Sequence, residues 1–223
     1  IISKSNDSYL NKLRFRLHML SHKQIRLLQA WKQNLFDELS IAEIMRISGK
    51  KTKPWVFNTL KLLVKQNLLS SIRKGNVDIY HLNLHNPFLI QTLQYIEIQH
   101  TLNFPHLKII EEIINTVPLK TYCLLVFGSY AEDKQKKDSD LDLCFLVEEK
   151  IIEKKIKPYV NELKLNFSLS IDEHYIAFDE FIKMVLHKEE NLGKQIMRKH
   201  ILFYNPDIYY QLLKEAHKHG FRP

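Results

Sequence analysis

The chain has 223 residues, 45% of them hydrophobic and 26% charged, with a net charge of +8. This composition is ordinary for a soluble globular protein and excludes a largely disordered chain, while the length predicts two modest domains. No apolar run approaches the roughly 20 residues that a membrane helix needs, and the first ten residues lack the apolar segment of a signal peptide. We therefore expect a cytoplasmic protein with no membrane partner.

The positive charge is concentrated in the N-terminal part of the chain. Residues 1–85 contain 15 Lys and Arg against 5 Asp and Glu, a net charge of +10, whereas residues 86–223 carry a net charge of −2. Phosphate contacts from Lys and Arg supply most of the non-specific affinity for nucleic acids. A polyanionic partner such as DNA is therefore expected for the first part, although a solvated basic surface has the same composition.

The first elements predicted are three helices. Apolar residues at helical spacing follow Ser21 and extend to Leu35, and a short second helix begins at Ser40. A third helix begins after Thr52, with Pro54 in its first turn, and runs to about residue 67. Its polar face carries residues at spacings of three and four, which suits a helix lying against DNA.

A hairpin follows the third helix, since apolar residues alternate on both sides of Lys74-Gly75-Asn76. Three helices and a hairpin are the element order of a winged helix, and residues 21–84 resemble the winged helix-turn-helix domains of prokaryotic transcription regulators. The resemblance implies DNA binding, although many winged helices bind proteins instead. The expected DNA-binding residues are Lys53, Asn58, Lys61, Lys65, Arg73 and Lys74.

The middle segment predicts two helices interrupted at Pro105. Apolar residues occur all round the first of them, which indicates a connector buried between domains or a dimerisation helix. A homodimer is therefore one of the partners considered. His85, His100 and His106 lie here at spacings that match no metal site.

Two buried strands are expected next, each containing one cysteine that we expect to be a free thiol. The run 120–127 ends at Gly128-Ser129, where glycine lets the backbone approach a phosphate and a helix beginning at Ser129 would favour an anion. The run 141–147 follows, with Asp140 and Asp142 on one face because strand side chains alternate. Two carboxylates beside such a turn are what Mg²⁺ bridging protein and phosphate requires. The alternative is a turn and a solvated strand end.

The motif G-S-Y-A-E-D-K-Q-K-K-D-S-D-L-D-L resembles the signature of the polymerase-β-like nucleotidyltransferase superfamily, and most closely its minimal nucleotidyltransferases. With the order strand, helix, strand, the resemblance extends over residues 120–204. It implies a small mixed β-sheet flanked by helices, with Mg²⁺ as the metal and a nucleoside triphosphate, ATP above others, as substrate. The residues expected to bind the nucleotide are Gly128, Ser129, Ser139 and Lys137.

The resemblance also implies a third carboxylate on a later strand. The segment 168–178 is predicted to be that strand, and Asp172 is the candidate if Leu169 and Ile171 face the core. A slip of one residue would exchange Asp172 for Glu173, so that alternative stays open. His174 shares the face of Asp172, where packing is favoured over substrate contact. The expected catalytic and metal-binding residues are thus Asp140, Asp142 and Asp172.

One departure bears on activity. Many members of the superfamily carry Arg-Gly after the alanine of the motif, whereas this chain has Glu132 and Asp133, which place acids near the expected triphosphate. Lys134, Lys136 and Lys137 offset them in part. A degenerate site that only senses nucleotide therefore stays open beside an active one.

The predicted architecture is an α+β protein with a winged-helix domain at 1–86, a helical connector at 87–118 and a nucleotidyltransferase domain at 119–223. The resemblance implies transfer of a nucleoside monophosphate to a hydroxyl of a protein, RNA or small molecule. The alternatives are a DNA-binding regulator with a nucleotide-sensing domain, and an antitoxin-like partner of a HEPN-type ribonuclease toxin.

Overall fold

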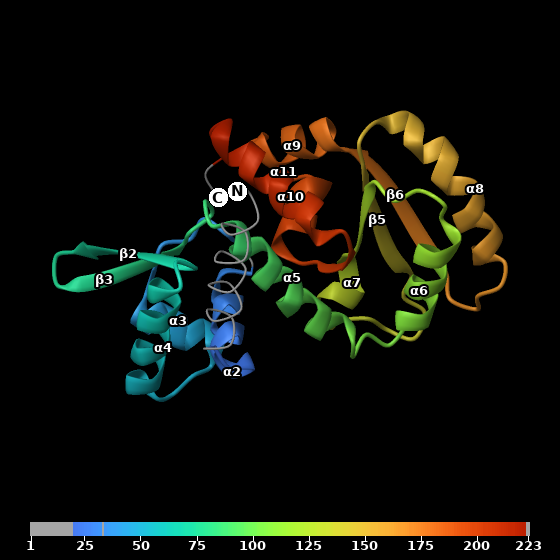
Figure 1. The fold of residues 1–223 in the computed structure, drawn as a ribbon. Helices are drawn as coiled ribbons and strands as arrows, with labels where there is room; N and C mark the ends of the chain where they lie inside the picture. The colour runs from blue at the N-terminus through green and yellow to red at the C-terminus, as the bar shows by residue number, and fades with distance from the viewer. Residues whose placement is uncertain (1–19, 33, 222–223) are drawn as a thin grey trace, which may run out of the picture. The chain divides into compact units, whose positions relative to one another are not determined.

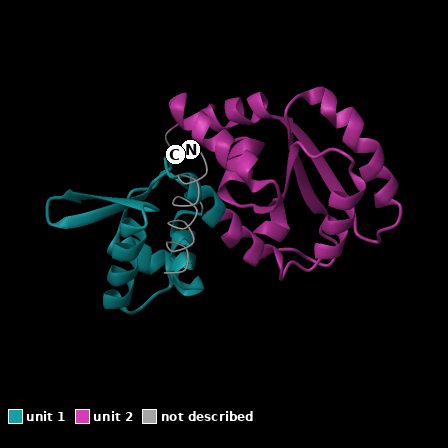
Figure 2. Ribbon diagram, in the orientation of Figure 1, with its two compact units in different colours: residues 1–92 teal, residues 93–223 magenta. Residues whose placement is uncertain are grey.

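The computed structural model describes residues 20–32 and 34–221. By its internal contacts the chain divides between Thr92 and Leu93 into two compact units (Figure 2). The division falls inside helix α5 (Pro87–Thr101), which begins in the first unit and ends in the second. Among the described residues, no helix combines the length and the apolar character needed to cross a membrane.

The first unit contains the helical segments expected from the sequence, with one difference. Helix α2 (His22–Ile25) passes into the 3₁₀ helix η1 (Arg26–Trp31), and α3 (Ile41–Ser48) and α4 (Lys53–Lys65) follow. The helix expected to reach Leu35 therefore ends at Trp31. The indole Nε1 of Trp31 donates a hydrogen bond to the carbonyl of Asp37 at 2.9 Å. Trp31 therefore anchors the loop between η1 and residue 39.

The predicted hairpin is present and belongs to a three-stranded sheet. Strands β2 (Leu69–Lys74) and β3 (Val77–Leu82) pair antiparallel around Gly75, whose φ of 60° suits the two-residue turn. The short strand β1 (Leu39–Ser40) pairs with β3, giving the order β1-β3-β2. Trp31, Ile44 and Leu60 are fully buried within this unit.

The second unit is built on a mixed four-stranded sheet of order β6-β5-β4-β7. Strands β4 (Tyr122–Val126), β5 (Leu141–Val147) and β7 (Ile201–Tyr204) pair antiparallel, whereas β6 (Ile171–Ala177) lies parallel to β5. The crossover between β5 and β6 runs through η2 (Lys150–Ile152) and α8 (Glu153–Lys164). Nearly every residue of β4 and β5 is buried, because both faces of the sheet are covered.

Helices cover the two faces of the sheet unequally. Helices α6 (Leu107–Thr116) and α8 lie on one face, while α9 (Phe178–Leu186), α10 (Leu192–Arg198) and α11 (Pro206–Lys218) gather on the other side (Figure 1). The first face forms a continuous hydrophobic core in which Ile110 and Ile113 of α6 pack with Leu143 and Phe145 of β5. This part of the fold is the mixed α+β arrangement that the sequence predicted.

Cys123 and Cys144 are free and completely buried, as predicted. Burial raises the pKa of both thiols, because it disfavours the thiolate. Neither thiol is therefore a reactive nucleophile at neutral pH.

Candidate active site

The turn after β4 brings the backbone against a carboxylate of β5. Gly128 has a φ of 65°, in the left-handed region that glycine adopts without strain. A Cβ atom at this position would lie 2.0 Å from Oδ2 of Asp142, far inside any real contact. Glycine is therefore required here twice, by backbone conformation and by the space that Asp142 occupies. The conformation of the turn and the position of the Asp142 carboxylate therefore depend on each other.

The surroundings of Asp142 make it an unusual carboxylate. Burial is the main cause that raises its pKa, and the negative charges of Asp172 and Asp140 raise the pKa further. His174 and a hydrogen bond from the backbone N–H of Ser129 act in the opposite direction. A half-buried carboxylate with two acidic neighbours is one that a bound cation would stabilise.

The strand register decides which acid of β6 accompanies Asp142. Strands β5 and β6 are parallel neighbours, and Asp142 lies directly opposite Asp172. Their side chains therefore share a face of the sheet. Glu173 lies opposite Leu143, and its side chain is buried on the other face in an ion pair with Lys164 of α8. The alternative of Glu173 as third carboxylate does not fit this register.

His174 lies beside Asp172 on the same face. Its Nε2 is 3.2 Å from Oδ2 of Asp172, and its ring packs edge to face on Phe127 with ring centroids 5.4 Å apart. The histidine thus both packs, as the sequence analysis favoured, and orients a candidate site carboxylate. The contact between His174 and Asp172 can be predicted from alternation along β6. The contact of His174 with Phe127 cannot, because it depends on the turn after β4.

Asp140 precedes β5 and is exposed, close enough to Asp142 to raise the pKa of that group. Over the described ranges, no three His, Cys, Asp or Glu side chains converge closely enough to hold a metal ion. Asp172 is turned toward His174, with 59% of its side chain exposed. Carboxylate oxygens are the donors that a divalent cation prefers, and Asp142 and Asp172 lie in register on one face, with Asp140 directly before β5.

The expected nucleotide-binding residues lie in and after this turn. Gly128 and Ser129 begin α7 (Gly128–Ala131), a single turn of helix, so its dipole is small, and the N–H of Ser129 is engaged by Asp142. The hydroxyl of Ser139 accepts a hydrogen bond from the N–H of Lys136 at 2.8 Å and closes the loop before β5. Lys137 is exposed on that loop.

Glu132, one of the two acids that depart from the superfamily motif, is neutralised locally. Lys134 forms an ion pair with Glu132 at 2.7 Å, and this contact is the main cause that lowers the pKa of Glu132. Lys199 and Arg198, at the end of α10, lower it further. Sequence reasoning missed these two cations, because they lie more than 60 residues after Glu132 and follow no spacing rule.

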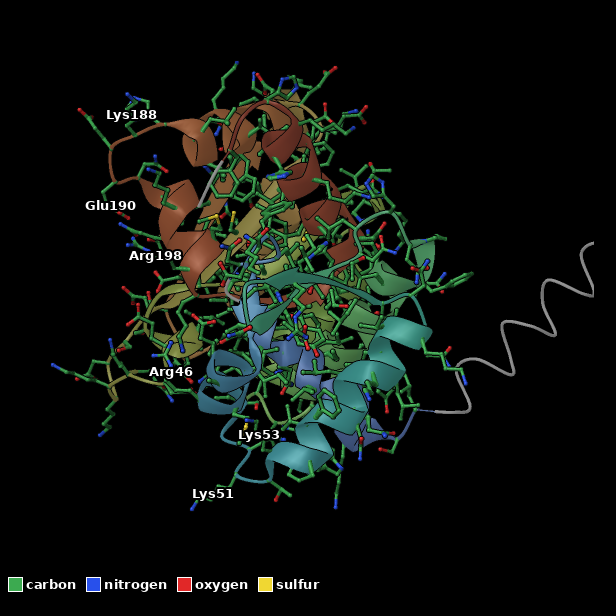
Figure 3. The ribbon with its side chains drawn as sticks, turned by 90° about the vertical axis from the view of Figure 1, so that its left-hand side faces the viewer. Arg46, Lys51, Lys53, Lys188, Glu190 and Arg198 are labelled. Carbon is green, nitrogen blue, oxygen red and sulfur yellow. The ribbon has the colours of Figure 1, made fainter. Side chains whose placement is uncertain are left out.

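The expected DNA-binding residues of the first unit fall into two groups. Those on α4 are exposed, and Lys61 lies over the Phe57 ring at 4.3 Å. The hairpin cations are paired instead, Arg73 with Asp78 at 3.7 Å and Lys74 with Glu38. Figure 3 labels further cations in and around α3 and the start of α4. The exposed residues on α4 are Lys53, Asn58, Lys61 and Lys65.

Comparison with known proteins agrees with the geometry of the second unit. Residues 108–209 match the family model described as polymerase beta, nucleotidyltransferase. The match supports a nucleotidyltransferase domain that includes α6 and all four strands of the second sheet. No curated protein sequence matches the chain. The family match leaves the first unit uncovered, so its assignment as a winged helix stays a prediction.

Proposed function

We propose, from the nucleotidyltransferase match over residues 108–209, that this protein transfers a nucleoside monophosphate from a nucleoside triphosphate to a hydroxyl acceptor with the aid of Mg²⁺. The observation that carries the proposal is the pairing of Asp142 with Asp172 on adjacent strands, beside a glycine turn that admits nothing larger. ATP is the proposed donor, and the acceptor is a protein, an RNA or a small molecule.

The chemistry needs three things from the chain. Asp140, Asp142 and Asp172 would hold the cation, which when bound polarises the α-phosphate and lowers the pKa of the acceptor hydroxyl. Asp172, whose Oδ2 lies 3.2 Å from Nε2 of His174, would either hold the cation or accept the hydroxyl proton. The acceptor oxygen then bonds to the α-phosphorus, the bond between the α- and β-phosphates breaks, and pyrophosphate leaves.

The ion pair between Lys134 and Glu132 supports an active rather than a degenerate site. An unpaired Glu132 beside the turn would repel a triphosphate, whereas Lys134, Arg198 and Lys199 surround it with positive charge. The same cations could assist departure of pyrophosphate. Glu132 is thus compensated by Lys134 within the motif and by the charges of Arg198 and Lys199 outside it.

The experiment that tests the proposal measures transfer of label from α-labelled ATP, in the presence of Mg²⁺, to components of a lysate from the protein's own source. Asp172→Asn removes one carboxylate charge and should lower transfer at least about 100-fold, because even outer-shell partners of metals cost 10 to 100-fold. Glu173→Gln is the matched control, one residue away and on the opposite face.

The Glu173→Gln variant should keep its transfer rate. It should lose some thermal stability, because the ion pair with Lys164 is removed. Equal losses of transfer in both variants would contradict the assignment of Asp172. Transfer that is absent from the wild type, with ATP binding retained, would favour the nucleotide-sensing alternative. An antitoxin-like role beside a HEPN-type toxin predicts instead that the protein binds that toxin without transferring label.

We propose that the first unit is a winged helix that binds DNA. Its support is the net charge of +10 on residues 1–85 and the exposed polar face of α4. The ion pairs of Arg73 and Lys74 indicate that the hairpin contributes less to affinity than α4 does, since these cations already have acidic partners.

A paired comparison separates the two groups of cations. The double variant Lys61→Gln, Lys65→Gln should weaken binding to duplex DNA and lower the slope of log K against log salt by about 1.8, or 0.9 for each phosphate that is no longer neutralised. The double variant Arg73→Gln, Lys74→Gln should change the slope less. Fluorescence anisotropy over a salt series measures both. A larger change of slope for the hairpin variant would mean that the hairpin, and not α4, contributes most to DNA affinity. A wild-type protein that binds no duplex DNA at low salt would contradict DNA binding by the first unit.

A further inference from the structure

A groove between the end of α9 and α10 lies outside the residues assigned to catalysis. Its volume is about 410 Å³, within the range of roughly 300 to 1,000 Å³ of small-molecule sites. The loop between the two helices forms one wall, and the segment after α11, at Gly220 and Phe221, forms another. All of these elements belong to the second unit.

The groove is held open by specific contacts. The side-chain amide of Asn191 donates hydrogen bonds to the carbonyls of Met184 and Glu189 at 2.8 and 3.1 Å, and its oxygen caps α10 through the N–H of Lys194. A Cβ at Gly193 would lie 2.6 Å from Cβ of Met184, so α10 packs on α9 as closely as only glycine permits. The loop is therefore fixed before any ligand binds.

The rim of the groove is cationic. Lys188, Lys194 and Arg198 face a single acid, Glu190, which forms an ion pair with Arg198. Figure 3 shows Lys188, Glu190 and Arg198 along the same edge of this unit. Nζ of Lys194 donates to the carbonyl of Lys188 at 2.8 Å and keeps two further donors. Within the described residues neither lysine forms an ion pair, so the rim has an excess of two positive charges.

The floor of the groove is apolar, with Leu186 and Met197 half-buried and Val185 buried beneath them. An apolar floor with a cationic rim suits a ligand with a flat ring at one end and a phosphate at the other. Methionine adapts well to such rings. His187 adds a donor, because its Nδ1 accepts the N–H of Glu189 and the neutral ring then carries its proton on Nε2.

We propose that this groove binds a nucleoside phosphate unit, with the phosphate on Lys188, Lys194 and Arg198 and the base on Leu186 and Met197. The unit is either a free nucleotide or one nucleotide of a single strand, which present the same chemistry to the groove. Arg198 at the rim also contributes positive charge that lowers the pKa of Glu132, the acid after the motif's alanine. The groove thus provides a nucleotide position whose lining residues are separate from the candidate active site.

The test uses the full chain and two probes without Mg²⁺, AMP and a fluorescein-labelled uridylate octamer. The double variant Lys188→Gln, Lys194→Gln should weaken binding of the recognised probe about tenfold for each charged hydrogen bond to phosphate that it removes. For the octamer, the slope of log K against log salt should fall by about 1.4. Lys183→Gln is the matched control, an exposed lysine of α9 that pairs with Asp179 outside the groove.

Asp142→Asn separates this proposal from the proposed transferase activity. Binding that survives Asp142→Asn and fails in the double lysine variant supports the groove, whether or not the protein transfers nucleotides. Binding of AMP supports a free nucleotide, and binding of the octamer alone supports a strand. Binding of neither probe, or binding that the lysine variant leaves unchanged, overturns the proposal. The melting temperature of each variant verifies that it folds.

Discussion

Asp142→Asn should abolish nucleotide transfer and make the protein more stable at neutral pH. Transfer should fall at least about 100-fold, because the variant removes a charge from the centre of the carboxylate group. The gain in stability follows from the raised pKa of Asp142, which results first from burial and then from Asp172. An ionised carboxylate in this position costs free energy of folding, and asparagine removes the charge with little change in shape.

The sign of the pH dependence follows from the direction of the shift. A group whose pKa is raised by folding contributes its stability in full below its unfolded pKa, and this contribution is lost as the pH rises through the folded value. The melting temperature of Asp142→Asn should therefore exceed that of the wild type at pH 7 and approach it in acid. Each kcal/mol corresponds to about 2–4 °C for a chain of this size.

Scanning calorimetry at a series of pH values measures this difference directly. Asp138→Asn is the control, an exposed acid in the loop before β5 that should alter neither transfer nor stability. A melting temperature of Asp142→Asn below the wild type at pH 7 would mean that contacts of the carboxylate, such as the hydrogen bond from Ser129, outweigh the cost of its burial.

Gly128→Ala should damage both the fold and the site. Its φ of 65° is strained for alanine, and the new methyl group would lie on Oδ2 of Asp142. Relief requires that the carboxylate or the turn move, which should cost roughly 1–3 kcal/mol of stability. A displacement of about 1 Å at the reacting groups lowers rates about 100-fold, and we expect a loss of transfer of that size.

Gly49→Ala separates the two causes, because Gly49 has the same φ of 65° with open space where its Cβ would lie. Its loss of stability measures the backbone strain alone and should be smaller. A double-mutant cycle completes the test, since Gly128→Ala should cost less when Asp142 is replaced by alanine. Additive effects in this cycle, or equal losses for the two glycine variants, would show that the turn tolerates a side chain after all.

The sequence predicted the strands of the second unit well. Strand β5 has the expected bounds, because its apolar run is bordered by charged residues, and alternation indicated Asp172 as the acid that shares a face with Asp142. The choice between Asp172 and Glu173 could not be made locally. It depends on the register against β5 and on the pairing of Glu173 with Lys164 across the crossover.

Other features depend on contacts that no local pattern contains. The helical segment ends at Trp31, whose indole donates a hydrogen bond to the carbonyl of Asp37, and apolar spacing does not contain this contact. The N–H of Ser129 donates a hydrogen bond to Asp142 and not to a bound phosphate. This contact depends on how closely β5 approaches the turn. The cations of α10 near Glu132 are brought there by the packing of α10 on α9.

The parallel pairing of β5 with β6 determines when the candidate site comes into existence. Asp142 and Asp172 are separated by a helical crossover, and such non-local pairs form late because closing the intervening chain costs entropy. A nascent or partly unfolded chain therefore lacks the paired carboxylates, even when the Gly128 turn has formed. Any ligand that needs both carboxylates binds only the completed sheet and draws the folding equilibrium toward it.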